Sequence, residues 1–161
     1  MDGAIARSGN IDQDLVDKWI KHPYFARAGV KSLDRNDFDM VKEDIKDYSL
    51  EGGAATLTEF TIASIARAVD HLPSVPKNWL VTGGGRKNGY MMVALMDRLQ
   101  TSVDPVETVG WNGDSLEAEC FGYLAVRRFL GLPISFPSTT GVPKPMTGGV
   151  IFEPDASRES A

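Results

Sequence analysis

A short apolar run that enters three consecutive glycines is the feature that most constrains the fold of this chain. Residues 78–88 read Asn-Trp-Leu-Val-Thr-Gly-Gly-Gly-Arg-Lys-Asn, and a helical pattern of apolar residues follows. Glycines weaken a helix or strand but permit a sharp turn or a close approach to another group. The stretch therefore predicts a strand, a turn and a helix. Ligands of α/β proteins settle at such strand ends, so the turn is either a ligand seat or a tight connection without a ligand.

This glycine turn differs from the two common phosphate-binding loops. A Walker A loop has four residues between its first glycine and a Gly-Lys-Ser/Thr ending, whereas Gly85 is followed by Arg86, Lys87 and Asn88. The dinucleotide fingerprint has spaced glycines and an acidic residue about twenty positions later, whereas these glycines are contiguous. Neither loop fits the sequence.

The composition favours one soluble domain. The chain has 161 residues, of which 42% are hydrophobic, enough to build a core. Its 22 acidic residues exceed its 17 basic ones, which argues against a nucleic-acid partner, since such a partner requires a basic surface. No apolar run suits a signal peptide or a membrane span, so we expect no membrane partner and a cytoplasmic location.

The single cysteine and the two histidines do not form a catalytic or metal-binding pattern. Cys120 lies among apolar residues, so we expect a buried, inert thiol rather than a nucleophile. His22 and His71 lack a neighbouring Cys or the Glu-x-x-His spacing of zinc ligands. No residue of this chain is therefore predicted to bind a metal.

The first fifty residues predict a short strand and two helices. Residues 4–6 are a brief apolar piece before a Ser-Gly-Asn turn, which is typical of a strand end. Asp12 or Asp14 can cap a helix that runs to about Lys21. The next helix has apolar residues at positions 38, 41 and 45, a spacing that indicates packing into a core.

A long helix is expected before the glycine turn. Residues 51–53, Glu-Gly-Gly, would separate it from the helix before, because Thr56 and Glu59 have the spacing of a capping box. Its apolar stripe continues to Leu72, and two prolines stop it ahead of the strand.

The second half alternates strands and helices. After the glycines we expect a largely buried helix from about Gly89 to Gln100 and a strand over 103–109, in which Pro105 marks an edge or a break. Asp114 and Glu117 have capping-box spacing at the start of another helix.

The remaining residues complete an α/β fold class with a helix-rich first half. Gly131 closes the last long helix. Residues 137–143 read as a loop, 150–152 as a last strand and 155–161 as a frayed tail. Residues 1–154 are thus predicted to form a single α/β domain.

With these elements placed, the sequence resembles the C-terminal half of the anhydro-N-acetylmuramic acid kinases, a family of the actin, heat-shock ATPase and sugar-kinase superfamily. The resemblance rests on ordered blocks along almost the whole chain. These blocks are His22–Ala26, Lys31–Ser32 with Arg35 and Phe38, Ala55–Thr58, Gly83–Gly85 with Asn88, Gly113–Asp114 with Glu117–Ala118, Gly131–Pro133, and Thr140–Gly141 with Gly148–Gly149. The resemblance implies the C-terminal lobe of a ribonuclease-H-like fold with an incomplete sheet.

The resemblance also implies a reaction and its ligands. The family uses ATP and Mg²⁺ to phosphorylate the 6-oxygen of the sugar while water opens the 1,6-anhydro bridge, which yields N-acetylmuramic acid 6-phosphate for peptidoglycan recycling. By this likeness, Gly83, Gly84, Gly85 and Asn88 would contact the adenosine end of ATP. Glu117 would be a carboxylate that faces the cleft and the amino sugar.

Each of these residues also has a purely structural interpretation. Asn88 suits the N-cap of the following helix. Glu117 could cap its own helix by reaching back to the amide of Asp114. Arg86 and Lys87 replace the smaller residues of many relatives, and they could contact ATP phosphates, a partner surface or solvent.

The family motifs that carry out catalysis are absent from this sequence. The Gly-Thr-Ser phosphate loop, the aspartate that activates water and the Gly-Pro-Gly-Asn turn would lie upstream of Met1 in the family pattern. We therefore expect no catalytic residue in this chain and no activity from it alone, because phosphoryl transfer needs several parts at once.

Two other interpretations remain open. The chain could be a non-catalytic nucleotide-binding or oligomerisation module, in which a homodimer or a missing N-terminal lobe covers the edge that a strand at residues 4–6 would expose. It could also be an α/β nucleotide-binding domain unrelated to the kinases.

Overall fold

The computed structural model describes residues 2–152, without the side chain of Arg35, and divides the chain into two compact units. The first unit covers residues 1–116 and the second covers residues 117–161. The expected frayed tail at 155–161 lies outside the described residues. The single domain over 1–154 remains a prediction. Among the described residues, no helix has both the length and the apolar character needed to cross a bilayer.

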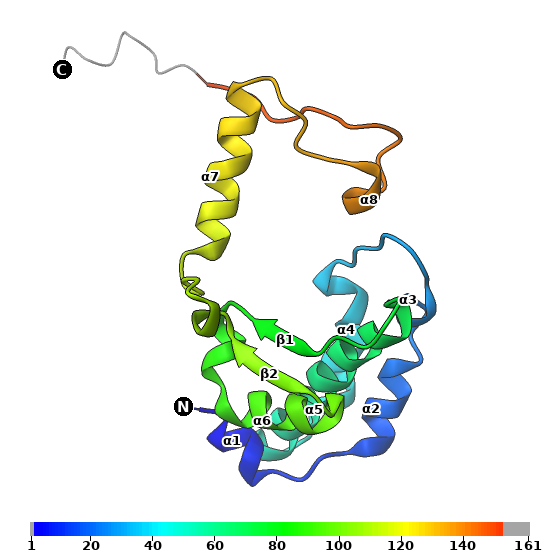
Figure 1. Cartoon of the computed structure of the whole chain (residues 1–161). Helices are drawn as coiled ribbons and strands as arrows, with labels where there is room; N and C mark the ends of the chain where they lie inside the picture. The colour runs from blue at the N-terminus through cyan, green and yellow to red at the C-terminus, as the bar shows by residue number, and fades with distance from the viewer. Residues whose placement is uncertain (1, 153–161) are drawn as a thin grey trace, which may run out of the picture. The chain divides into compact units, whose positions relative to one another are not determined.

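The first unit begins with a series of helices (Figure 1). These are α1 (Ala4–Ser8), α2 (Gln13–Ile20), α3 (Pro23–Ala26), the 3-10 turn η1 (Arg35–Phe38), α4 (Asp39–Ile45), α5 (Leu50–Ala66) and the 3-10 turn η2 (Arg67–His71). The expected helix-rich first half is therefore confirmed.

The strand expected at residues 4–6 is wrong, because these residues belong to α1. Ala6 is buried, whereas Ile5 is half exposed. Three apolar residues are too few to distinguish a helical from a strand period. The helix lies close to α5, since a Cβ on Gly9 would collide with the backbone of Glu51. The edge that such a strand would have exposed is therefore not formed.

The helix expected after residue 12 is confirmed as α2. The Asp12 side chain accepts a hydrogen bond from the Leu15 N–H at 3.0 Å, which satisfies one of the free amides at the helix start. Val16 and Trp19, on one face of the helix, are each only 1% exposed. The apolar period thus identified the buried face correctly.

The expected break at residues 51–53 is wrong, because α5 starts at Leu50 and runs through both glycines. Its cap is Ser49, whose Oγ accepts a hydrogen bond from the Gly52 N–H at 3.1 Å. Thr56 lies inside the helix, fully buried, so it cannot open a capping box. Glycine costs about 1 kcal/mol in a helix interior, and the packing of this long helix outweighs that cost.

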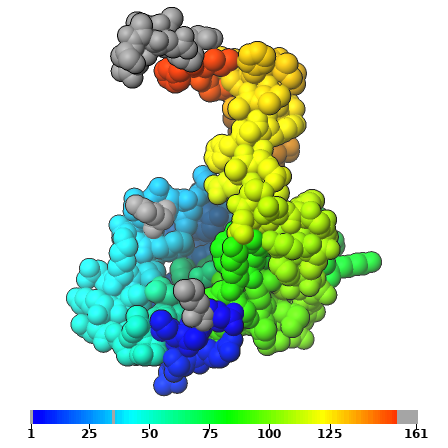
Figure 2. Space-filling view, turned by 90° about the vertical axis from the view of Figure 1, so that its left-hand side faces the viewer, coloured from blue at the N-terminus to red at the C-terminus, as the bar shows by residue number. Residues whose placement is uncertain are grey.

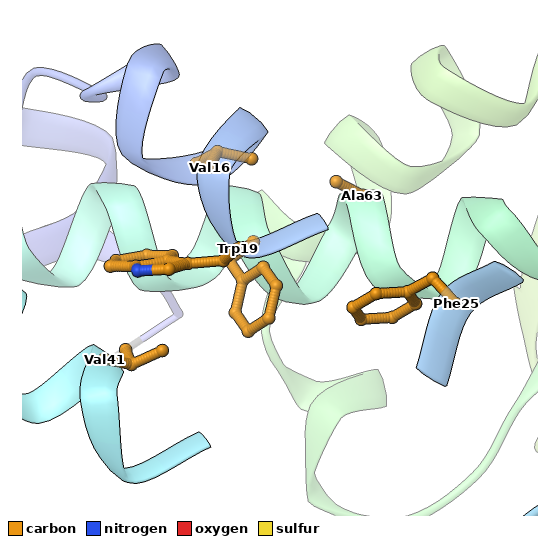
Figure 3. Close-up of a cluster of buried hydrophobic side chains, with 6 residues drawn as sticks. Val16, Trp19, Phe25, Val41 and Ala63 are labelled. Atoms are coloured by element: carbon orange, nitrogen blue, oxygen red, sulfur yellow. The ribbon is translucent and has the colours of Figure 1, made fainter. Parts of the chain in front are cut away.

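The first hydrophobic cluster forms where α5 meets the helices around it. Figure 3 shows side chains from α2, α3, α4 and α5 converging on it. Trp19 and Phe60 meet edge to face, with 5.3 Å between ring centroids. The cluster also confirms the expected packing of residues 38, 41 and 45, since Val41 is buried and Phe38 and Ile45 pack against it. Its buried members are Val16, Trp19, Phe25, Val41, Phe60 and Ala63.

The second half of this unit contains the strand, turn and helix predicted from the glycine stretch. β1 (Asn78–Val81) leads through the 3-10 turn η3 (Gly84–Lys87) into α6 (Gly89–Leu99), and β2 (Ser102–Pro105) follows. β1 and β2 pair in parallel with Asn78 opposite Ser102, and Figure 1 shows them side by side. Mixed helices and a small parallel sheet confirm the α/β class.

The second hydrophobic cluster joins the sheet to the long helices. Leu95 and Leu99 of α6 and Val103 of β2 meet Ile62 of α5, and all four are buried. Two expectations need correction here. α6 is not largely buried, since Val93 and Met96 are 55% and 42% exposed, whereas Leu95 and Leu99 are buried. The second strand stops at Pro105, where the chain turns into the 3-10 turn η4 (Val106–Val109).

The described part of the second unit contains α7 (Leu116–Phe129), apart from its first residue, together with α8 (Pro137–Thr140) and irregular chain. Gly131, with φ of 68°, ends α7, and the Leu132 N–H donates to the Arg127 carbonyl at 2.8 Å, as expected for a helix closed by glycine. Residues 137–140 form a helix rather than a loop, and residues 150–152 form no strand. A single bridge joins Ser135 to Met146 within the described residues.

Most apolar side chains of α7 are exposed. No described residue of α7 is buried, and Phe121 and Phe129 are 64% and 78% exposed. Cys120 is also exposed, so the prediction of a buried thiol is wrong. The prediction rested on the apolar neighbours of Cys120 in the sequence, and apolar neighbours do not specify which segment would cover them.

Candidate functional site

The glycine turn lies directly after the carboxyl end of β1. Gly83 has φ of 72° and ψ of −171°, a conformation that is essentially restricted to glycine. Gly83 and Gly84 are exposed, and no heavy atom lies within 4 Å of a Cβ built on either residue. The turn therefore offers bare backbone and open space at the end of the strand. Gly85 differs, because its Cβ would meet the Met91 side chain at 2.7 Å.

Asn88 occupies the N-cap of α6. Its Oδ1 accepts a hydrogen bond from the Met91 N–H at 3.1 Å, so the N-cap interpretation of this residue is confirmed. The cap fixes the direction in which α6 leaves the glycine turn. A contact between Asn88 and adenosine stays a prediction.

The N-terminal residues lie against the start of α6, which the sequence analysis did not anticipate. The Asp2 carboxylate accepts a hydrogen bond from the Gly89 N–H at 2.6 Å. A side chain on Gly3 would collide with Asn88 and Tyr90. In the space-filling view of Figure 2, the N-terminal residues, in blue, lie against the green part of the chain. The first backbone N–H of α6 is thus already hydrogen-bonded to a carboxylate of the chain itself.

Arg86 ties the glycine turn to the turn that follows β2. Its side chain is only 5% exposed. One guanidinium nitrogen donates to the Gly83 carbonyl at 2.8 Å, and Nε donates to Glu107 Oε1 at 2.8 Å. The remaining nitrogen lies 3.0 Å from Asp114 Oδ1. The sequence analysis left the partner of Arg86 open, and the structure identifies two carboxylates.

The same cluster of charges includes Lys87. Its Nζ donates to both oxygens of Asp114, at 2.7 and 2.9 Å. The Lys87 ammonium and then the Arg86 guanidinium hold the pKa of Asp114 below its usual range. The pKa of Glu107 is also lowered, first by its own backbone N–H and then by Arg86. The two cations of the glycine turn are therefore each paired with carboxylates.

Gly113 provides the space in which the Arg86 side chain lies. A Cβ on Gly113 would come within 2.7 Å of the Arg86 Cζ, and the Gly113 N–H donates to Glu107 Oε1 at 3.2 Å. The second glycine-containing turn thus allows a close approach by an arginine. Glu107 and Asp114 were missed as partners of Arg86. The available signal was the placement of opposite charges after two neighbouring parallel strands, whose ends meet at one edge.

Glu117 lies in the first turn of α7 and is exposed. The interpretation that it caps its own helix through the amide of Asp114 is wrong, because that N–H donates to Asn112 Oδ1 at 3.0 Å. Glu117 belongs to the second unit and the glycine turn to the first. Its contact with the sugar stays a prediction.

The histidines have structural roles. His22 Nδ1 accepts a hydrogen bond from the Tyr24 N–H at the start of α3, and His71 Nε2 lies 2.7 Å from the Phe25 carbonyl oxygen. Within residues 2–152, no three His, Cys, Asp or Glu side chains are grouped closely enough to hold a metal ion.

Comparison with known proteins gives a consistent family. The sequence profile described as anhydro-N-acetylmuramic acid kinase matches residues 1–154. A protein of that name from Rhodospirillum rubrum is 53% identical over 151 residues, which cover 94% of this chain and 40% of the relative.

Two further relatives carry the same name. The Brucella anthropi protein is 52% identical over 151 residues, or 93% of this chain and 40% of the relative. The Mesorhizobium japonicum protein is 49% identical over 150 residues, with the same two shares. The chain thus spans about 40% of the length of these curated relatives.

Proposed function

The chain belongs to the anhydro-N-acetylmuramic acid kinase family, and from this premise we propose that it supplies the adenosine side of the ATP site in such a kinase. In this proposal it is the C-terminal part of the enzyme, with the lobe architecture of the ribonuclease-H-like fold. The parallel β1–α6–β2 unit supports that architecture.

The proposed parent reaction consumes ATP, water and 1,6-anhydro-N-acetylmuramic acid. The sugar 6-oxygen receives the γ-phosphoryl group, water opens the anhydro bridge, and the products are ADP and N-acetylmuramic acid 6-phosphate. Such a reaction serves peptidoglycan recycling in the cytoplasm. Glu117 is the residue of this chain that we assign to the sugar, since a carboxylate accepts hydrogen bonds from sugar hydroxyls.

The bare backbone of the glycine turn is the observation that carries the proposal. It lies at the carboxyl end of a parallel strand, where α/β proteins place their ligands. The space beside Gly83 and Gly84 is open to a flat group. Asn88, at the end of the turn, would complete the adenosine contacts through its amide.

The charges around the turn favour the nucleoside end of ATP over its phosphates. Arg86 and Lys87 already pair with Glu107 and Asp114, so the chain's own carboxylates offset the positive charge that a triphosphate would need. Mg²⁺ is commonly held by substrate phosphates and one or two carboxylates, and no residue described here is assigned to it. We therefore place the phosphates and Mg²⁺ on the rest of the enzyme.

A titration monitored by the amide chemical shifts of residues 83–88 tests the proposed seat. Adenosine and ATP should both shift these amides, whereas unchanged shifts at saturating ligand would reject the seat. In a parallel assay with the anhydro sugar and Mg·ATP, the chain alone should form no sugar 6-phosphate. Efficient product formation by the pure chain would contradict the assignment of catalysis to the remaining part of the enzyme.

The exposed face of α7 favours one alternative, a non-catalytic module that associates with a second copy or with a separate N-terminal lobe. Phe121 and Phe129 are large, exposed and on the same helix, and such residues often mark protein interfaces. Sedimentation over a range of concentrations tests self-association. A monomer at high concentration would exclude the homodimer.

A further inference from the structure

We propose that Arg86 is a positioning residue of the nucleotide seat: its guanidinium holds the Gly83 carbonyl against the turn after β2 and is not itself the cation that receives phosphate. The inference rests on the proposed function, because it concerns the same glycine turn. It adds a role for a residue to which neither the resemblance nor the comparisons assign one.

The Arg86 side chain connects two turns. One terminal nitrogen of its guanidinium donates to the Gly83 carbonyl, whereas Nε and the other terminal nitrogen contact Glu107 and Asp114. These partners follow two different strands, β1 and β2. A planar guanidinium with five fixed N–H groups can make these bonds at the same time, whereas an ammonium is a single point of charge.

Burial separates Arg86 from its neighbour. The Arg86 side chain is 5% exposed, whereas that of Lys87 is 61% exposed. A cation that receives phosphate must present N–H groups to the ligand. The atoms Nε and both terminal nitrogens of Arg86 are each already directed at an oxygen of the chain. The burial and these bonds therefore favour an effect of Arg86 on the ligand through the turn that it holds over a direct bond to phosphate.

The glycine turn depends on the hydrogen bond from Arg86 because its first two glycines make few contacts of their own. Gly83 and Gly84 have no side chain and no heavy atom near the Cβ position, and glycine loses more conformational entropy on ordering than other residues. The bond from Arg86 fixes the carbonyl of the residue with the positive φ. A pre-ordered turn binds its ligand more tightly, because less ordering remains to be done on binding.

Conservative and non-conservative variants of Arg86 distinguish the two roles. Arg86→Lys keeps the charge but loses the connection between the two turns, and Arg86→Gln loses both. If Arg86 positions the turn, both variants should weaken the binding of adenosine and the binding of ATP by the same factor. We expect about tenfold, as for other residues that orient a binding group. If it receives phosphate, Arg86→Lys should retain ATP affinity and Arg86→Gln should lose ATP affinity selectively.

Gly113→Ala gives a test in which no charge changes. The added Cβ would displace the Arg86 guanidinium, with Cζ only 2.7 Å away, so adenosine and ATP should again weaken together. Gly122→Ala is the matched control, since no atom lies within 4 Å of its Cβ. Lys77→Gln, an exposed residue before β1, controls for the loss of one positive charge. Both controls should bind adenosine like the parent chain.

Binding is measured by calorimetry with adenosine and with ATP, after thermal unfolding has shown that each variant folds. Equal weakening of both ligands in Arg86→Lys supports the inference, and retained ATP affinity in that variant overturns it. Unchanged binding in every Arg86 variant also overturns it. If the parent chain binds neither ligand, the proposed seat itself is rejected, a result distinct from the other three.

Discussion

The hydroxyl of Thr56, inside α5, accepts a hydrogen bond at 3.0 Å from the backbone N–H of Asp12, which caps α2. The same hydroxyl donates to the Gly52 carbonyl at 2.9 Å. Thr56 is fully buried, so these bonds are sheltered from water. One side chain thus links the start of one helix to the interior of another.

Replacing Thr56 by valine should release the Asp12 amide. Thr56→Val keeps the shape but removes the acceptor, and leaving a donor without a partner costs about 1–3 kcal/mol in free energy of unfolding. Native-state hydrogen exchange should show faster exchange at the Asp12 amide. Thr56→Ser retains the hydroxyl and should preserve the protection of that amide, and equal exchange in the two variants would contradict the link.

The second hydrophobic cluster should be sensitive at Leu95. This residue is 1% exposed and touches both the long helix and the sheet, so Leu95→Ala should cost about 2–5 kcal/mol, from lost burial and the cavity left behind. Urea unfolding measures the change. Met96→Ala, next to it but 42% exposed, should cost far less. Similar losses of stability in the two variants would contradict the assignment of Leu95 to the buried face of α6.

Gly83→Ala should destabilise the turn because of its backbone conformation. A side chain at φ of 72° and ψ of −171° costs on the order of 1–3 kcal/mol. Gly84→Ala has equal open space but no positive φ, so it should be nearly neutral. Thermal unfolding of the two variants provides the comparison. A loss at Gly84 as large as that at Gly83 would argue against this turn geometry.

Acid should weaken the pair between α2 and α4. Asp44 accepts hydrogen bonds from Lys18 Nζ and from Trp19 Nε1, both at 2.8 Å. These donors, Lys18 first, lower the pKa of Asp44 below its usual 3.8. A lowered pKa in the folded state stabilises the protein above the unfolded value, and this stabilisation is lost as pH falls through the folded value.

Asp44→Asn should therefore be less stable than the parent chain at neutral pH and should approach it in acid. Urea unfolding at about pH 6 and about pH 2 measures the difference. Asp39→Asn removes an exposed partner of Lys42 on the same helix and should have little effect at either pH, as is usual for surface pairs. A difference between Asp44→Asn and the parent that is equally large at both pH values would contradict the assignment.

Cys120 should react with a thiol reagent without denaturant. The side chain is exposed, and exposure is one of the two conditions for thiol reactivity, together with thiolate formation. Titration with a chromogenic disulfide should count one thiol per folded chain. Protection that increases with protein concentration would instead indicate that a second copy covers this side of α7.

The parts of the fold that could be predicted are those with a local cause. The strand, turn and helix around Gly83–Gly85 follow from a change of apolar period at the glycines. The cap of α2 was narrowed to Asp12 or Asp14, and Asp12 is the one that caps, because a capping side chain bonds to an amide only three residues away. Gly131 was identified as a helix end for a similarly local reason.

The parts that could not be predicted depend on contacts between distant segments. The start of α5 was misplaced because Thr56 and Glu59 have capping-box spacing, whereas Thr56 binds Asp12 and Glu59 pairs with Arg98. The same holds for the candidate site. The glycines and the Asn88 cap were found from sequence, but the partners of Arg86 were not, because spacing does not specify how β1 and β2 align.

The bond between Asp2 and Gly89 has a practical consequence for protein production. Residues 87 positions apart meet at the start of α6, one residue beyond Asn88 and beside the candidate nucleotide seat. A purification tag fused ahead of Asp2 would therefore lie next to the candidate nucleotide site and could alter the binding that an assay measures. A cleavable tag, removed before titration, keeps foreign residues away from that site.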